Sequence, residues 1–148
     1  MDVSGTIDAI LSQKTGDVYT ISPDASVLDA VRLMAEKNVG ALIVVENEQV
    51  VGLISERDYT RKIVLHGKRS RETPVREIMS TNLTVIHPLE PVENCLRMMT
   101  EKRVRHLPVL KDNKVCAVIS IGDLVKHVIS CQSAALEHLE SYITGGYR

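Results

Sequence analysis

The sequence predicts an α/β fold built from two β-α-β-β-α units, and three observations support this prediction. Sliding the chain along itself by 65 residues aligns positions 17–64 with 82–129 without a gap, and 14 of these 48 positions are identical. In each copy, apolar residues recur first at helical spacing and then in short runs rich in Val, Leu and Ile. Each copy ends with a small residue, two apolar residues, Ser, two variable residues and Asp. Because units of this size bury little surface alone, we expect the two to share one core with pseudo-two-fold symmetry.

Each copy predicts the same order of elements: strand, helix, strand, strand and helix. In the first copy, a short strand at 18–21 precedes helical spacing of apolar residues at 27–35 and apolar runs at 41–45 and 50–54. Polar residues between the two runs indicate a tight turn, and a closing helix is expected after Ser55. The corresponding strands and helix of the second copy are expected at 83–86, 92–99, 107–110 and 115–119, before a closing helix that follows Ser120.

A second, shorter repeated segment precedes each copy, and it sets the expected domain boundaries. Thr6–Ser12 resembles Pro74–Ser80, and each is predicted to form a short helical turn. We expect a first domain at 6–64, a linker at 65–73, a second domain at 74–130 and a C-terminal helix or tail at 131–148. The tail has apolar residues at helical spacing, which we expect to cap the core. They are Ala135, Leu136, Leu139, Tyr142 and Ile143.

The composition excludes several classes of protein. The net charge is −1, so no general attraction to nucleic acid or to an anionic membrane is expected. The chain has no Trp and no Phe, which argues against aromatic platforms for single-stranded nucleic acid. The basic stretch at 61–71 is interleaved with acidic residues and is predicted to be a solvated helix and linker. No apolar run is long enough to span a membrane and no basic leader is present, so we expect a cytoplasmic protein.

The chain shows no linear signal for a metal site or for catalysis. The three cysteines (Cys95, Cys116 and Cys131) are widely spaced and form no C-x-x-C pair, so buried, unreactive thiols in a reducing compartment are expected. The histidines show no metal-binding spacing, and no Gly-rich phosphate loop or nucleophile–base grouping is present. We therefore expect no metal and no catalytic residues, and we do not expect an enzyme.

The pattern that closes each copy allows two interpretations. It is Gly-Leu-Ile-Ser-Glu-Arg-Asp at 52–58 and Ala-Val-Ile-Ser-Ile-Gly-Asp at 117–123. A serine at a helix start caps free backbone N–H groups, and an aspartate three residues later completes a capping box. The same helix start also attracts a phosphate, and a carboxylate one turn in can accept hydrogen bonds from both hydroxyls of a ribose. Because capping alone does not explain why the pattern recurs after a strand in both copies, both interpretations stay open.

These features together resemble a pair of cystathionine-β-synthase-type (CBS) domains, the Bateman module. The resemblance covers roughly residues 6–130 and is strongest to stand-alone pairs, for which Ser-Glu-Arg-Asp-Tyr at 55–59 and Arg-His-Leu-Pro at 105–108 are familiar. It implies a non-catalytic regulatory module that binds AMP, ADP, ATP, NAD(H) or S-adenosylmethionine in the cleft between the repeats. Such a module would act as an energy or redox sensor that modulates an unknown partner protein. The resemblance also implies a homodimer, a flat disc of four CBS units.

The resemblance assigns ligand contacts residue by residue. Asp58 and Asp123 would hold the ribose hydroxyls, while Ser55 and Ser120 would lie at the phosphate. The base would be recognised by backbone and apolar groups at two strand regions of each repeat. These positions are Ile21, Val39, Gly40, Ala41, Ile86 and Val104. The basic candidates for phosphate contact are Arg57, Arg105 and His106, and Pro108 completes the Arg-His-Leu-Pro segment.

The repeats are not equivalent at the basic positions. Where the second has Arg105 and His106, the first has Gly40 and Ala41, and Arg57 is present only in the first. The hypothesis is that the second site prefers a charged nucleotide, whereas the first is weaker, vacant or suited to a larger ligand such as a dinucleotide. The alternative to a nucleotide sensor is a nucleic-acid-binding or structural adaptor without a nucleotide ligand, in which the Ser-x-x-Asp motifs act only as caps.

Overall fold

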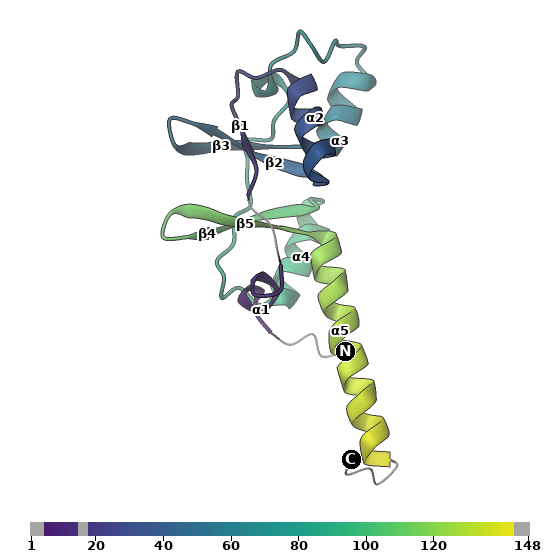
Figure 1. The fold of residues 1–148 in the computed structure, drawn as a ribbon. Coiled ribbons are helices and arrows are strands. Elements are labelled where there is room, and N and C mark those ends of the chain that lie inside the picture. Colours follow the sequence, from purple (N-terminus) through teal and green to yellow (C-terminus); the bar gives the residue numbers. More distant parts are fainter. Residues whose placement is uncertain (1–4, 15–17, 144–148) are drawn as a thin grey trace. The chain divides into compact units, whose positions relative to one another are not determined.

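Two β-hairpins organise the chain in this computed structural model, one in each of two units (Figure 1). The central unit is Asp17–Thr84, and the terminal unit combines Met1–Gly16 with Val85–Arg148. The structure describes residues 5–14 and 18–143, without the side chains at 135, 136, 138 and 141–143. The terminal unit is therefore assembled from two segments that are far apart in the sequence.

The hairpins form where the paired apolar runs predicted them. β2 (Ala41–Glu46) pairs antiparallel with β3 (Gln49–Ser55), and β4 (His106–Lys111) pairs antiparallel with β5 (Lys114–Ser120). Each loop has two residues, and all four have positive φ: Asn47, Glu48, Asp112 and Asn113. Two successive residues with positive φ give the type I′ turn, whose twist matches that of the flanking strands. The turn residues therefore fix the register of each hairpin.

In the central unit, a third strand and a crossover helix complete the sheet. β1 (Thr20–Ile21) pairs in parallel with β2, and α2 (Val27–Lys37) connects the two strands. Ser26 caps α2 because its side-chain oxygen accepts the Asp29 N–H at 3.0 Å. Asn38 ends the helix in the left-handed conformation, which asparagine tolerates well.

The remaining elements of the central unit close its core. α3 (Glu56–Asp58) continues directly into the π-helical segment η1 (Tyr59–Val64), and α2 lies beside this segment (Figure 1). A short 3-10 helix, η2 (Val75–Glu77), follows the linker. The enclosed core is aliphatic, as the lack of Trp and Phe requires. Its buried residues are Val27, Ala30, Met34, Leu42, Val44, Ile54, Ile63, Val75 and Ile78.

The terminal unit repeats this architecture with one difference. α4 (Val92–Lys102) precedes β4, but the strand predicted at 83–86 is reduced to a single parallel bridge between Ile86 and Val109. In the central unit Ile43 N–H donates to the Tyr19 carbonyl at 3.1 Å, but its counterpart Pro108 has no N–H, so this bond is missing and only one bridge remains. The predicted α/β class and the duplicated order of elements are otherwise confirmed. The buried core residues are Ile7, Ile10, Ile86, Val92, Cys95, Met99, Leu107, Val109, Ile119 and Leu124.

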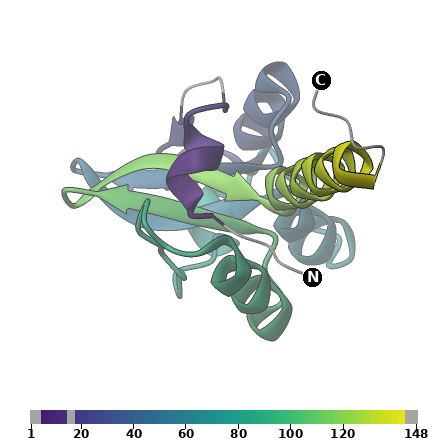
Figure 2. The ribbon, with the colours of Figure 1, turned by 90° about the horizontal axis from the view of Figure 1, so that it is seen from below.

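The short turns that precede the repeats pack in the unit of the other repeat. α1 (Ile7–Leu11) lies against the β4–β5 hairpin (Figure 2) and donates from Ile7 N–H to the Glu90 carbonyl at 3.0 Å. In the central unit, Val75 N–H donates to the Ala25 carbonyl at 2.8 Å. Since Ala25 and Glu90 occupy equivalent places in the repeats, the two turns dock on equivalent surfaces. The boundaries of the two compact units therefore differ from those of the sequence repeats, because each short turn belongs to the unit of the other repeat.

The closing helix of the second repeat and the predicted tail helix form one element. α5 (Ile121–Ile143) runs without interruption over 23 residues (Figure 1). Leu139, one of the tail positions expected to cap the core, is 53% exposed. The other tail positions, Ala135, Leu136, Tyr142 and Ile143, lie outside the described side chains. Over the described ranges, no helix combines the length and the apolar character that crossing a bilayer requires.

The docking of α1 can be tested by truncating a core side chain. Ile7 is fully buried, so Ile7→Ala is expected to lower the free energy of unfolding by about 2–5 kcal/mol. Ile129 in α5 is 57% exposed, and Ile129→Ala in the same unit is expected to change it by no more than about 0.5 kcal/mol. Guanidinium unfolding followed by circular dichroism measures both values. Equal effects of the two substitutions would contradict the packing of α1 in the terminal core.

Candidate functional site

A serine and an aspartate join strand to helix in the central unit. Ser55 ends β3, and its side-chain oxygen accepts the Asp58 N–H at 3.3 Å. In return, Asp58 Oδ2 accepts the Ser55 backbone N–H at 3.0 Å and the Ser55 hydroxyl at 3.2 Å. These reciprocal bonds form a capping box and hold the carboxylate in one orientation.

The terminal unit repeats this geometry where β5 meets α5. Asp123 Oδ2 accepts the Ser120 backbone N–H at 2.8 Å, and Ser120 Oγ accepts the Asp123 N–H at 3.1 Å. The capping interpretation of the motif is therefore confirmed in both repeats. The side chain of Asp123 is 25% exposed, against 11% for Asp58. Asp123 is thus the more accessible of the two carboxylates.

The first N–H groups of both helical segments already have partners inside the protein. Glu56 N–H donates to the Gly40 carbonyl at 3.0 Å, and Ile121 N–H donates to the Arg105 carbonyl at 2.9 Å. The third N–H of each segment is capped by the motif serine, so two of the first three donors are used. These helix starts therefore offer a phosphate fewer donors than the sequence-based prediction assumed.

Each motif carboxylate also has a lysine partner that the sequence analysis missed. Lys62 Nζ lies 3.1 Å from Asp58 Oδ1, and Lys14 Nζ lies 2.7 Å from Asp123 Oδ2. The first pair has a linear signal, because a lysine four residues after an aspartate lies on the same helix face. The second pair joins positions 109 residues apart, and no spacing rule links them.

These contacts set the charge of the site in the terminal unit. Burial is the largest influence on the pKa of Asp123 and raises it, but hydrogen bonds from Lys14 and Ser120 outweigh burial and hold the pKa below its ordinary 3.8. Burial lowers the pKa of His106 below its ordinary 6.5, and the charges of Lys14 and Arg105 add to this while Asp123 opposes it. At neutral pH, Asp123 is an anion and His106 is a neutral imidazole.

The strand starts predicted to flank the ligand lie beside the motif serines. In the sheet register, Ala41 pairs with Ser55 and His106 pairs with Ser120. Arg105 precedes β4 and is exposed. Within each unit, the structure therefore brings the predicted strand start and the Ser-x-x-Asp motif together.

The other predicted contacts have different surroundings. Ile86 is 4% exposed and Pro108 is buried, so both side chains belong to the interior of the terminal unit. Ile21 and Val104 are half-buried and pack against the cores of their own units. Arg57 is half-buried at the start of α3. The backbone of Ile86 also has partners, because its N–H donates to the Pro108 carbonyl at 2.9 Å and its carbonyl accepts the Leu110 N–H at 2.8 Å.

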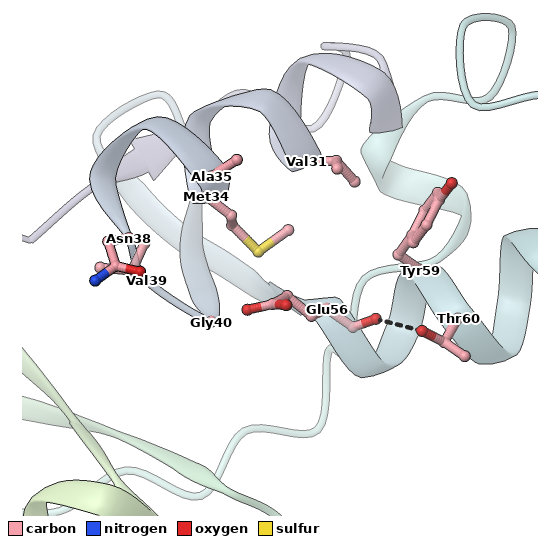
Figure 3. A pocket seen from close by; sticks show the side chains of 9 residues that line it. All are labelled: Val31, Met34, Ala35, Asn38, Val39, Gly40, Glu56, Tyr59 and Thr60. Carbon is pink, nitrogen blue, oxygen red and sulfur yellow. Dashed lines mark hydrogen bonds between the residues drawn. The ribbon is translucent and has the colours of Figure 1, made fainter.

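A pocket in the central unit is lined by two of the residues predicted to contact the ligand. It has a volume of about 520 Å³ and lies between α2 and the segment formed by α3 and η1 (Figure 3). Val39 and Gly40 line it, whereas Ser55 and Asp58 do not. The remaining lining residues are Val31, Met34, Ala35, Asn38, Glu56, Tyr59 and Thr60. The pocket therefore joins the strand start to helical residues that the sequence analysis did not single out.

The cysteines differ from expectation at two positions. Cys95 is buried, and burial raises the pKa of its thiol to about 11. Cys116 is exposed, so the expectation of a buried thiol is wrong there, because alternate residues of β5 face outward. Cys131 is only partly buried. In the described part of the chain, no group of three or more His, Cys, Asp or Glu residues is placed to hold a metal ion.

Comparison with known families identifies the repeated unit. A family model described as the CBS domain matches residues 9–65 and again residues 75–130. The chain belongs to the CBS domain family. The mitochondrial CBS domain-containing protein CBSX3 of Arabidopsis thaliana is 39% identical over 153 residues, which cover 97% of this chain and 74% of that protein.

Solved structures share the CBS-pair fold. A crystal structure of a CBS domain, NE2398, is 44% identical with a TM-score of 0.81 and covers 85% of this chain and 98% of its own. A CBS domain pair solved in complex with 5′-methylthioadenosine and S-adenosyl-L-methionine has a TM-score of 0.75 and covers 87% of this chain and 98% of its own. It is 21% identical, so this likeness concerns the fold alone.

The half-buried imidazole of His106, in the second CBS repeat, predicts a pH dependence of stability. Because the pKa of His106 is lower in the folded protein, the unfolded chain binds more protons once the pH falls below about 6.5. The free energy of unfolding of the wild type should therefore decrease between pH 7 and pH 5 relative to that of His106→Gln. Urea unfolding across this range measures the difference, and parallel pH profiles of the two proteins would contradict the assignment.

Proposed function

We propose that the chain is a non-catalytic regulatory module in which the CBS repeats bind an adenine nucleotide, AMP, ADP, ATP or NAD(H). The observation that carries the proposal is the Asp123 carboxylate. It is ionised, oriented by Ser120 and one-quarter exposed at the start of α5. An oriented carboxylate of this kind is suited to accept hydrogen bonds from the two hydroxyls of a ribose.

The neighbouring groups fit the rest of a nucleotide. Arg105 is an exposed guanidinium, which suits bidentate contact with a phosphate. His106, being neutral at pH 7, would serve the phosphate as a hydrogen-bond donor and not as a charge. Asp58 is less exposed than Asp123, so we expect the site of the first repeat to be the weaker one. We propose, as the family resemblance implies, that the nucleotide binds in the cleft between the repeats.

The fold neighbour solved with 5′-methylthioadenosine and S-adenosyl-L-methionine supports the choice of an adenosine-containing ligand. Both of its ligands contain adenosine, as do all the nucleotides proposed here. Occupancy of the site would shift the population of two arrangements of the module only if the ligand has different affinity for them. We propose that this shift changes the interaction with a partner protein. A homodimer and a cytoplasmic location complete the proposal.

A structural adaptor without a nucleotide is the second candidate, and the capping geometry favours it. The reciprocal hydrogen bonds of Ser55 with Asp58 cap the helix start, so the motif has a structural role even without a ligand. The two candidates differ in one measurable respect. Only the nucleotide sensor gains stability when an adenine nucleotide is added.

A thermal-shift series with AMP, ATP, NADH and S-adenosylmethionine tests the proposal. A ligand present at about 100 times its dissociation constant is expected to stabilise the folded chain by about 2.7 kcal/mol. Asp123→Asn keeps the shape of the side chain but removes its charge, so the stabilisation should fall by at least half.

Asp112→Asn is the matched control for this series. Asp112 lies in the β4–β5 turn with φ of 53°, a conformation that asparagine accepts, and the substitution changes the net charge equally. Its response to the nucleotides should equal that of the wild type. A complete lack of response in the wild type would favour the structural adaptor instead.

A further inference from the structure

The ammonium group of Lys14 connects two acceptors in the terminal unit. Its Nζ lies 2.7 Å from Asp123 Oδ2 and 2.8 Å from the Val118 carbonyl oxygen. The backbone of Lys14 is itself held, since its N–H donates to the Ile10 carbonyl at 2.9 Å and Ile10 belongs to the core. The fold therefore anchors the backbone of Lys14, and the two acceptors hold its side chain, which is 31% exposed.

In the central unit, the two acceptors equivalent to the Val118 carbonyl and the Asp123 carboxylate bind two different donors. In the repeat alignment, Leu53 corresponds to Val118 and Asp58 to Asp123. The Leu53 carbonyl accepts a backbone N–H, that of Ser80, at 2.9 Å. The carboxylate of Asp58 pairs with Lys62 from the same helical segment.

The second repeat has a histidine where the first has that lysine. His127 corresponds to Lys62, and its Nε2 lies 3.5 Å from Cys131 Sγ. The ammonium of Lys14, supplied by the N-terminal segment, takes the place of both donors of the central unit. The charge on the Asp123 carboxylate is thus balanced by a residue outside the repeat.

From this arrangement we infer that Lys14 determines the specificity of the Asp123 site and selects phosphate-bearing ribonucleotides over neutral or cationic adenosyl compounds. The inference rests on the proposed function. It assigns a residue that neither the repeat alignment nor the family motif marks as part of the site.

The first reason is competition for one carboxylate oxygen. Asp123 Oδ2 accepts both the Ser120 N–H and the Lys14 ammonium. Two ribose hydroxyls that share one carboxylate use both of its oxygens, and since each oxygen offers about two acceptor positions, the hydroxyl at Oδ2 reaches it only when the ammonium moves away. A neutral nucleoside leaves the displaced ammonium without an anionic partner and therefore binds weakly.

The second reason is that a phosphate can form a new ion pair with the Lys14 ammonium after it has left Asp123. The lysine side chain is a flexible four-carbon stem, so its charge can move without a shift of the backbone. His106 pairs with Ser120, which bonds Asp123, and after burial the charges of Lys14 and Arg105 both lower the pKa of His106. A phosphate near these groups would receive Lys14 as well, whereas a sulfonium cation would be repelled.

Isothermal titration of AMP and of adenosine into wild type, Lys14→Met and Lys14→Gln tests the inference. The ratio of the two dissociation constants, adenosine over AMP, should fall by about two- to fivefold in both variants, since a partly exposed ion pair contributes on this scale. Adenosine itself should bind more tightly than to the wild type. Lys14→Gln keeps an N–H donor for the Val118 carbonyl, so it separates loss of charge from loss of packing.

Lys114→Met is the matched control. Lys114 is an exposed lysine at the start of β5 in the same unit, and its loss should leave the ratio unchanged. If the wild type binds AMP but the ratio is unchanged in both Lys14 variants, the inference is overturned and the proposed function stands. An equal fall in Lys114→Met would also overturn it, because general charge would then explain the effect. If the wild type binds neither compound, both the proposed function and the inference fail.

Discussion

The reciprocal hydrogen bonds between a serine and an aspartate at each strand–helix junction are the constraint on which the functional geometry depends. The serine ends a strand in register with the strand start of the same hairpin, as Ala41 with Ser55 and His106 with Ser120 show. The aspartate N–H is capped, so the helix begins at that point, and the carboxylate is fixed by the serine N–H. One four-residue pattern thus ends a strand, starts a helix and orients an acidic group.

An ionised carboxylate in a partly buried place needs a counter-charge, and the two repeats supply it differently. In the central unit the lysine follows the aspartate on the same helical segment, whereas in the terminal unit it comes from the segment after α1. The second solution connects the site to the N-terminal segment, whose own packing on Pro88 and Glu90 holds Lys14 near Asp123. Duplication of a sequence therefore does not produce two equivalent sites.

The features predicted correctly from the sequence are those that local chemistry determines. Apolar periodicity predicted α2 and α4, and the polar residues between the paired apolar runs predicted tight turns, which the structure has at 47–48 and 112–113. The Ser-x-x-Asp pattern predicted its own capping bonds. What the sequence could not reveal are contacts between distant positions, such as α1 on the terminal core and Lys14 on Asp123, because no spacing rule connects residues about 100 positions apart. The strand at 83–86 was overestimated because Pro108, opposite it, has no N–H to donate and only one bridge forms.

A crystal structure of the chain with AMP would identify the group that contacts the Asp123 carboxylate. We expect both ribose hydroxyls to lie within hydrogen-bond distance of Asp123 and the Lys14 ammonium to have left Oδ2 for the phosphate. A complex in which AMP binds elsewhere, while Lys14 and Asp123 keep their 2.7 Å contact, would contradict it.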